Sequence, residues 1–446
     1  MKKRMVMAGV AAAMAVSALG TAASAESVKI MSFTDEVPKM LERYVETHPD
    51  CGFEFSLEDD ATIVPTTDGA YQPALDQKLL SDSDDAPDIY TAEAAFVLKY
   101  TQGEMADCAA SYADLGIDVE AALEAAQIAP YTVDIGTNPD GQLVALGYQA
   151  TGGAFIYRRS IAKEVFGTDD PAQIAEILGA ESGNWDKFWE AAEKLAEAGV
   201  GIVSGDGDIW HAVENSSDEG WIVDDMLHID PKREEFMDIS MKLKEGNLYN
   251  DTRDWQEGWF ADMQGVGEKP VFGFFGPAWL INYTLAPNCG GTAEGEGTYG
   301  DWAVCASPVG FFWGGTWVLA NKNSIDKPGV KELIEWITLD ATEDGLQYAW
   351  ANGLMSAEGT KDSVASGTVM EISDGSTAFL AGQNMFEAFV PANKYANGQN
   401  LTPYDESINQ YWRDAVRQYT SGEKTKEEAI EDFKINVEEN LDIEAE

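Results

Sequence analysis

Apolar positions along the chain alternate between two periods. Residues 28–33 form a short apolar run that is typical of a buried strand, and a helical pattern begins at Pro38 and stops at 48–49. Residues 142–148 and 154–157 are strand-like again. Because short strands alternate with longer helices in this way, the sequence predicts an α/β fold in which helices are layered on sheets.

The chain beyond residue 183 repeats this alternation more clearly. An apolar stripe with helical spacing follows Asn184, which we expect to cap a helix that ends at Gly199. Residues 200–204 and 271–275 are predicted strands. The segment 425–428 has the capping-box pattern Thr-x-x-Glu and predicts a last helix.

Length and charge bound the domain organisation and the partners. A chain of 446 residues suggests two or three domains, and no internal repeat or low-complexity linker marks their boundaries. The Gly-flanked segments 149–153 and 307–315 are the best places for the chain to cross between lobes. The formal charge is −49, with 29 Lys and Arg against 78 Asp and Glu. Such a polyanion repels phosphate backbones and anionic membranes, so we expect no nucleic-acid partner.

Residues 1–25 have the pattern of a secretory signal. A basic start at 2–4 is followed by a run of apolar and small residues over 5–19, which is shorter than a membrane span. The small-x-small triplet 23–25 predicts cleavage after Ala25. We therefore expect an extracytoplasmic mature protein, in the periplasm or at the cell surface, and the signal contains no lipobox cysteine.

Cysteine and histidine usage argues against a metal or redox centre. The four cysteines show no C-x-x-C spacing, and the three histidines form no H-E-x-x-H pair, so we expect no metal and no cofactor. Cys289 and Cys305 enclose a short Gly-rich loop and could pair in an oxidising compartment. Free, buried thiols fit the sequence equally well.

Motifs of the common hydrolase and nucleotide-binding folds are missing. No G-x-S-x-G and no Walker A loop occurs. One G-x-G-x-x-G spans 295–300, but it precedes a predicted strand and contains a Glu, so it predicts a loop and not a dinucleotide site. The Asp-Gly-Asp triplet at 206–208 predicts a turn. A glycosidase pair of carboxylates stays open, because 78 acidic residues offer many candidates.

Tryptophans beside glycine and proline carry the functional signal. Trp279 follows a predicted strand in the segment 275–279, and Trp313 lies in a Phe-Trp-Gly-Gly-Thr-Trp run. Trp210 follows the turn expected at 205–208. Aromatic rings on loops at strand ends can cover the apolar face of a sugar, while nearby polar side chains accept hydrogen bonds from its hydroxyls. Together these rings favour a carbohydrate-type pocket.

Several motifs occur in an order that resembles one known family. They are the loop 32–36 after the first strand, the Pro-Asp-strand motif 86–93, the hinge-like segment 147–159, the helix start 184–188, the Gly-Pro segment 275–279, the Gly-Gly segment 313–316 and the C-terminal stretches 402–405 and 422–429. In this order they are similar to the extracellular solute-binding proteins, family 1, of carbohydrate ABC transporters, the family of maltose-binding protein. The resemblance covers essentially the whole mature chain.

This resemblance implies a two-lobed, periplasmic-binding-protein-like α/β fold of type II, with the ligand cleft between lobes that are joined by hinge crossings. The N-terminal lobe is expected to comprise 26–148 and 312–355, and the C-terminal lobe 149–311 and 356–446. The implied function is not enzymatic. A ligand that bridges the lobes stabilises the closed form, which a membrane permease then recognises.

We expect ten positions to contact the ligand, most of them within the motifs that carry this resemblance. The rings expected to stack on sugar are Phe33, Trp210, Trp279 and Trp313. The positions expected to hydrogen-bond its hydroxyls are Asp35, Glu93 and Gln149, with Thr34, Thr316 and the Gly314 segment assisting.

Three other functions remain open at this point. A secreted glycoside hydrolase would share the aromatic residues and paired acids but would cleave its sugar. A polyamine or other small-solute binder would share the fold and place acids around a cation. A sensor ectodomain would need a partner kinase in place of a permease. For a transport protein we expect a small carbohydrate ligand, permease subunits as partners and a monomeric state.

Overall fold

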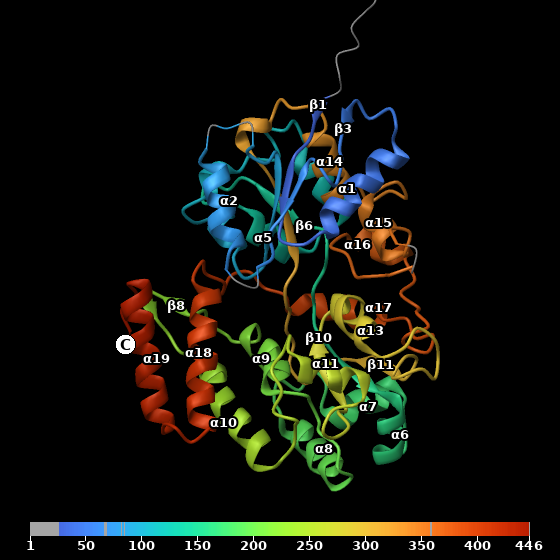
Figure 1. The fold of residues 1–446 in the computed structure, drawn as a ribbon, viewed down its shortest axis with the longest axis vertical. Helices are drawn as coiled ribbons and strands as arrows, with labels where there is room; N and C mark the ends of the chain where they lie inside the picture. Colours follow the sequence, from blue (N-terminus) through green and yellow to red (C-terminus); the bar gives the residue numbers. More distant parts are fainter. Residues whose placement is uncertain (1–25, 67–68, 82, 84, 357–358, 446) are drawn as a thin grey trace, which may run out of the picture.

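The computed structural model shows two lobes, each built on its own β-sheet (Figure 1). It describes residues 26–66, 69–81, 83, 85–356 and 359–445. The signal predicted at 1–25 therefore lies outside the described residues. The first strand lies in the upper lobe of Figure 1, and the last helix runs along the side of the lower lobe.

The first lobe contains a five-stranded sheet with the strand order β4-β2-β5-β12-β6. Its strands are β2 (Ile30–Ser32), β4 (Ala61–Ile63), β5 (Ile89–Glu93), β6 (Ala145–Gly147) and β12 (Thr316–Ala320). Strand β2 pairs in parallel with β4 and β5, whereas β12 runs antiparallel to β5 and β6. The apolar run predicted at 28–33 contains β2, whose three residues are all buried.

Helices cover both faces of this sheet because alternate strand residues point to opposite sides. Val318 of β12 belongs to an apolar cluster with residues of α1 and α14, whereas the next residue, Leu319, packs with α2, α3 and α5. The helices of this lobe are α1 (Glu36–Thr47), α2 (Tyr71–Leu79), α3 (Val97–Thr101), α4 (Val119–Ala126), α5 (Pro130–Gly136), α14 (Val330–Thr338), α15 (Leu346–Ala351) and α16 (Gly367–Ile372). A two-stranded pair, β1 (Glu26–Ser27) with β3 (Phe53–Glu54), lies at its far end (Figure 1).

The second lobe contains a three-stranded antiparallel sheet with β7 at its centre. Strand β7 (Ala154–Arg158) pairs with β10 (Gly273–Gly276) on one side and β11 (Trp302–Cys305) on the other. Its helices are α6 (Arg159–Phe166), α7 (Pro171–Leu178), α8 (Asp186–Glu197), α9 (Asp206–Glu214), α10 (Pro231–Glu245), α11 (Glu257–Gln264), α12 (Ala278–Leu280), α13 (Ala286–Asn288), α17 (Phe386–Ala392), α18 (Asp405–Thr420) and α19 (Lys426–Leu441). A short hairpin joins β8 (Ile222–Val223) to β9 (Met226–Leu227).

Helix ends follow the predicted capping chemistry in part. The capping box at 425–428 is confirmed: Thr425 and Glu428 exchange hydrogen bonds between side chain and backbone at the start of α19. The cap predicted at Asn184 is displaced by one residue. Helix α8 starts at Asp186, whose backbone N–H donates to the Asn184 side chain at 3.1 Å.

Two local predictions in the second lobe are wrong. Residues 200–204 form only isolated bridges to neighbouring segments and no ladder. The triplet 206–208 opens helix α9 and is not a free turn, because the Asp208 carboxylate accepts hydrogen bonds from the backbone of Ser204 and Gly205 and so caps the helix. The loop predicted at 295–300 is confirmed, since these residues form only turns and bends.

The chain crosses between the sheets at the two predicted places. Residues 148–153 lead from β6 of the first sheet to β7 of the second, and residues 306–315 lead from β11 back to β12. Each crossing therefore begins and ends at a strand that is fixed in its own sheet.

The two crossings are hydrogen-bonded to each other. Gly152 and Phe312 form an antiparallel bridge, and the N–H of Gly153 donates to the carbonyl of Phe311 at 2.8 Å. The approach is so close that a Cβ on Gly153 would lie 2.1 Å from the Phe311 ring. Glycine is therefore required where the two segments pass each other.

A third connection runs from α16 to α17, beyond residue 355, where the N-terminal lobe was expected to end. Helix α16 contacts α4 and α15, whereas α17 contacts β7 of the second lobe. Ser366, the N-cap of α16, donates its hydroxyl to the carbonyl of Ala126 at 2.8 Å, and Val369 is fully buried. These contacts hold the chain on the first lobe as far as the end of α16.

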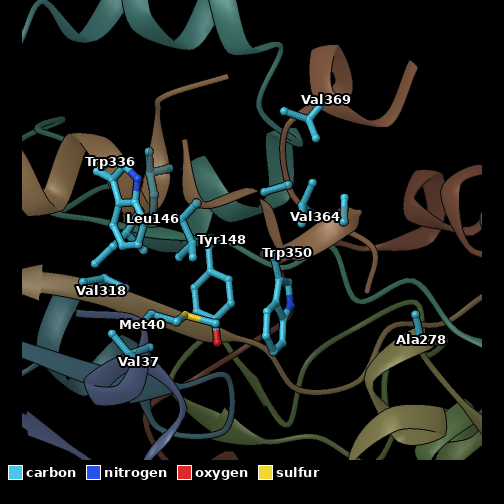
Figure 2. Close-up of a cluster of buried hydrophobic side chains, with 14 of the residues drawn as sticks. Val37, Met40, Leu146, Tyr148, Ala278, Val318, Trp336, Trp350, Val364 and Val369 are labelled. Carbon is cyan, nitrogen blue, oxygen red and sulfur yellow. The ribbon is translucent and has the colours of Figure 1, made fainter. Parts of the chain in front are cut away.

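The largest apolar cluster includes residues of both lobes, and Figure 2 shows part of it. Met40 comes from α1, Tyr148 follows β6 and Trp350 lies on α15. The rings of Tyr148 and Trp350 extend in the same direction (Figure 2). The Tyr148 hydroxyl donates to the carboxylate of Glu36. A separate cluster fills the second lobe.

All four cysteines are free, so the pairing of Cys289 with Cys305 is not formed. The Cys289 thiol instead donates to the carbonyls of Ala286 and Gly291, and Cys305 is buried in β11. Among the described residues, no group of three or more His, Cys, Asp and Glu is arranged to hold a metal ion. None of the helices in the described ranges is both long and apolar enough to cross a membrane.

Thiol reactivity tests this description. We expect one fast-reacting thiol in the native protein, because Cys51 is half-buried whereas Cys108, Cys289 and Cys305 are 7%, 0% and 3% exposed. When the protein is denatured but not reduced, titration with an aromatic disulfide reagent should detect four thiols. The variant Cys51→Ser should lack the fast phase. A count of two in denaturant would show that a disulfide forms.

Candidate functional site

Polar residues of the first lobe gather at one edge of its sheet, which faces the second lobe. Residues 33–35 follow the end of β2, and Glu93 is the last residue of β5. Thr316 begins β12 directly opposite Glu93, and Gln149 comes two residues after β6. This grouping follows from the topology, because the carboxyl ends of parallel strands meet at one edge of a sheet.

The corresponding edge of the second lobe presents aromatic rings. Trp279 lies just after β10, and Trp313 lies in the crossing that leads to β12. The indole N–H of Trp279 donates to the carbonyl of Trp313 at 3.0 Å, and the two rings meet with their centroids 4.6 Å apart. The hydrogen bond fixes the two predicted rings relative to each other.

Two further rings complete this surface, and the sequence analysis missed both. The ring centroids of Trp255 and Trp279 are 6.3 Å apart, and their planes are nearly parallel. The ring centroids of Tyr283 and Trp255 are 6.4 Å apart. Trp255 is 40% exposed and Tyr283 59% exposed, so both present ring surface to solvent. We call Trp255, Trp279, Trp313 and Tyr283 the aromatic wall.

Local backbone features explain why these two rings were missed. Trp255 has φ +64°, a left-handed conformation that no sequence pattern predicts for tryptophan. Tyr283 lies on a π-helical turn, Ile281–Leu285, between α12 and α13. The sequence did contain one signal for Trp255. This residue follows the polar run 250–254 and does not belong to a helical apolar stripe.

Tyr283 faces the acidic loop of the first lobe. Partial burial raises the pKa of the Tyr283 hydroxyl, and the charges of Glu36 and Asp35 raise it further. Burial also raises the pKa of Glu36, although the hydrogen bond from Tyr148 opposes this shift. The aromatic wall of the second lobe therefore stands opposite carboxylates of the first.

Gly314 lies between the two sides of the site. A Cβ on this residue would be 3.2 Å from Oε1 of Glu93 and 3.4 Å from the Trp279 ring, and its φ is +71°. The other carboxylate oxygen of Glu93 accepts the backbone N–H of Ala95 at 2.7 Å. Glycine thus allows a carboxylate of one lobe and a ring of the other to approach the same stretch of backbone.

Negative charge accumulates where the lobes meet. Burial, reinforced by the neighbouring charge of Glu406, raises the pKa of Glu93 to about 7. Burial and the charge of Asp405 raise the pKa of Glu214 to about 7. Glu406 of α18 accepts a hydrogen bond from the Gln72 side chain of α2 at 2.8 Å, so one of these acids directly joins the two lobes.

The predicted loop 33–35 occupies the expected edge. The half-buried Phe33 ring meets Tyr71 and Phe96 edge-on, at 5.9 and 6.1 Å. The Thr34 hydroxyl accepts the backbone N–H of Glu36 at 3.4 Å, and Asp35 is exposed and pairs with Lys39 at 2.5 Å. The Phe33 ring is thus packed within its own lobe as well as placed at the edge.

Three predicted residues are not available to a ligand in this structure. The Trp210 ring is 1% exposed and packs on Phe236 in the core of the second lobe, because residue 210 lies on α9 and not on a loop. Gln149 is 7% exposed and donates to the Asp362 carboxylate at 3.1 Å. Thr316 is also 7% exposed.

Comparison with known proteins matches this chain to one family. The sequence model of the bacterial extracellular solute-binding proteins matches residues 32–344. A search of curated protein sequences gave no match.

Solved structures with a similar fold align over most of this chain. A crystal structure described as extracellular solute-binding protein family 1 aligns at TM-score 0.68 and 17% identity, covering 92% of this chain and 98% of that one. The galacto-N-biose-/lacto-N-biose I-binding protein of the ABC transporter from Bifidobacterium longum aligns at 0.66 and 15%, covering 94% and 98%. The GacH receptor of Streptomyces glaucescens, solved with acarbose, aligns at 0.64 and 15%, covering 93% and 98%. At these identities the likeness shows a periplasmic-binding-protein-like fold.

A substitution at Gly314 tests its place in the site. We expect Gly314→Ala to lower the free energy of unfolding by more than the ~1–2 kcal/mol typical of a left-handed alanine, because the added Cβ also contacts Glu93 and Trp279. The matched control is Gly295→Ala, which has φ +86° and no atom within 4 Å of its Cβ. Urea unfolding of both variants measures the difference. Equal losses would show that the contacts at residue 314 contribute nothing.

The raised pKa of Glu93 predicts a pH-dependent stability change. A carboxyl whose folded pKa exceeds its unfolded value destabilises the fold progressively as pH rises from about 4.5 to about 7. Glu93→Gln should therefore be more stable than the wild type at pH 8, by at most about 3 kcal/mol, and nearly equal to it at pH 5. Urea unfolding at both pH values checks this. The exposed control Glu193→Gln should show no such divergence, and a pH-independent effect of Glu93→Gln would refute the assignment.

Proposed function

The chain belongs to the bacterial extracellular solute-binding proteins, and on that premise we propose that it captures a sugar or oligosaccharide for an ABC importer. In this proposal the sugar binds between the lobes, the lobes close on it, and the closed protein delivers it to membrane permease subunits. The protein works as an extracytoplasmic monomer after removal of its signal behind Ala25, and it leaves the sugar intact.

The observation that carries the proposal is the pairing of unlike surfaces across the lobes. The aromatic wall offers flat apolar faces, which match the C–H face of a pyranose ring. Asp35 and Glu93 on the other lobe offer acceptors for hydroxyl groups. A sugar that touches both surfaces gains contacts only when the lobes are together, so it stabilises the closed form.

The solved relatives support carbohydrate as the ligand class. The protein from Bifidobacterium longum was solved in complex with lacto-N-biose, and a protein from T. maritima was solved with maltose bound. A third, from Bifidobacterium animalis subsp. lactis, was solved with β-1,6-galactobiose. These ligands differ in composition, so they support a class of ligand and not one particular sugar.

A polyamine is the second candidate ligand, and one observation favours it. Burial raises the pKa of Glu93, Glu214 and Glu406 where the lobes meet, and a cation would offset the cost of burying their charge. Aromatic faces also attract cations. A diamine would therefore find both kinds of partner at this site.

A thermal-shift panel on residues 26–446 separates these ligands. It would contain lacto-N-biose, maltose, β-1,6-galactobiose, acarbose, putrescine and spermidine. A ligand at 100 times its dissociation constant adds ~2.7 kcal/mol to stability, which raises Tm measurably. We expect a shift with at least one sugar, and that sugar should be recovered uncut. A shift with polyamines alone would replace the ligand class, and a cleaved sugar would refute a binding function.

A pair of tryptophan variants then tests the aromatic wall. Trp279→Ala should weaken the affinity for the shifting sugar about tenfold, which corresponds to ~1.4 kcal/mol, because one stacking face is lost. The control is Trp189→Ala, in which the half-buried ring removed lies on α8 beside Lys242. Titration calorimetry should find the control unchanged. Equal weakening in both variants would show that the wall is not the binding surface.

A further inference from the structure

A buried ion pair lies behind the aromatic wall. Arg413 of α18 donates two parallel hydrogen bonds to Asp254, from Nη1 to Oδ2 at 2.9 Å and from Nη2 to Oδ1 at 2.6 Å. The Asp254 side chain is 8% exposed and that of Arg413 is 21% exposed. A two-pronged pair of this kind fixes the direction of the carboxylate as well as its position.

The surrounding fold leaves room for this pair. Gly207, in the first turn of α9, lies against it, and a Cβ at that position would be 2.7 Å from both Oδ1 of Asp254 and Nη2 of Arg413. Any larger residue there would displace one partner. The ion pair therefore fits only because Gly207 has no side chain.

Asp254 reaches the aromatic wall by two routes. The first route is a side-chain contact: Oδ2 lies 3.4 Å from Nε2 of His211, and the His211 ring is stacked on the Trp313 ring with centroids 3.5 Å apart and planes 11° apart. The carboxylate thus lies beside the imidazole, and the imidazole covers one face of Trp313. The other face of that indole remains for the rings of the wall or a ligand.

The second route is the backbone. Trp255, next to Asp254 in the chain, has φ +64°, a conformation that is unfavourable for a bulky side chain unless its surroundings impose it. Its immediate neighbour, Asp254, is anchored by the two hydrogen bonds from Arg413. In this shape the Trp255 ring lies near those of Trp279, Trp313 and Tyr283.

We infer that Asp254 is a positioning residue for ligand binding, which sets the geometry of the aromatic wall through His211 and Trp255 without touching the ligand. The inference rests on the proposed function for its consequence on affinity, but not for its consequence on the wall itself. The charges agree with it. Burial would raise the pKa of Asp254, but the nearby His211 ring and the hydrogen bonds and charge of Arg413 outweigh burial and hold the pKa well below its usual range.

The test uses the isosteric variant Asp254→Asn and a matched control. Asp88 pairs with Lys327 at 2.6 Å in the first lobe, and its side chain is 7% exposed and that of Lys327 20%. Asp88→Asn thus removes a charge of similar burial. Asp88 comes just before the start of β5, whereas Glu93 is at the opposite end of that strand. Trp255→Phe supplies a reference for the spectrum without that indole.

The first readout needs no ligand. Near-ultraviolet circular dichroism of the free protein should change in Asp254→Asn in the bands that Trp255→Phe removes, with an unchanged far-ultraviolet spectrum. Asp88→Asn should leave those bands as in the wild type. If Asp254→Asn does not fold, Arg413→Lys decides the matter, because lysine keeps the charge but cannot make the two parallel bonds. Unchanged indole bands in the folded variant would overturn the inference.

The second readout is affinity, measured by titration with maltose and with lacto-N-biose. For whichever sugar binds the wild type, Asp254→Asn should bind about tenfold more weakly and Asp88→Asn within twofold. An equal loss of affinity in both variants would show that Asp254 only stabilises the fold, and it would overturn the inference. If the indole bands change as expected but neither sugar binds the wild type, the positioning role stands and the result counts against the proposed function.

Discussion

The hydrogen-bonded passage of the two crossings is the constraint on which the rest of the molecule depends. Thr151 accepts the N–H of Trp313 at 3.1 Å and donates its hydroxyl to the carbonyl of Gly314 at 2.9 Å, so the crossings are joined on both sides of the Gly152 bridge. This junction holds the polar edge of one sheet against the aromatic edge of the other. Any rotation of one lobe against the other would have to pivot near these bonds, because they tie Trp313 to the first crossing.

Buried charge is the second organising feature. Where Asp254 meets Arg413, the carboxylate has a partner and its negative charge stabilises the fold. Glu93 and Glu214 have acidic neighbours, and burial raises the pKa of each to about 7. The same lobe junction therefore contains one fully compensated carboxylate, which gives rigidity, and others whose burial costs free energy until a proton or a ligand compensates them.

The sequence predicted what depends on period and topology, and missed what depends on packing. The strand at 28–33, both crossings and the placement of Glu93, Trp279 and Trp313 follow from apolar runs that end at glycine or polar residues. Trp210 was misplaced because Asp-Gly-Asp is a turn signal, whereas Asp208 turned that segment into a helix start. Trp255 went unnoticed because its backbone conformation is imposed by tertiary contacts, which leave no local pattern.

The insertion of β12 between β5 and β6 also constrains how the protein can fold. The Tyr112 hydroxyl bonds the carbonyl of Val318, 206 positions along the chain, and the first sheet is incomplete until that segment arrives. Such long-range closure slows folding and delays it until most of the chain has been synthesised. The topology that places Glu93 and Thr316 side by side thus also affects the timing of folding.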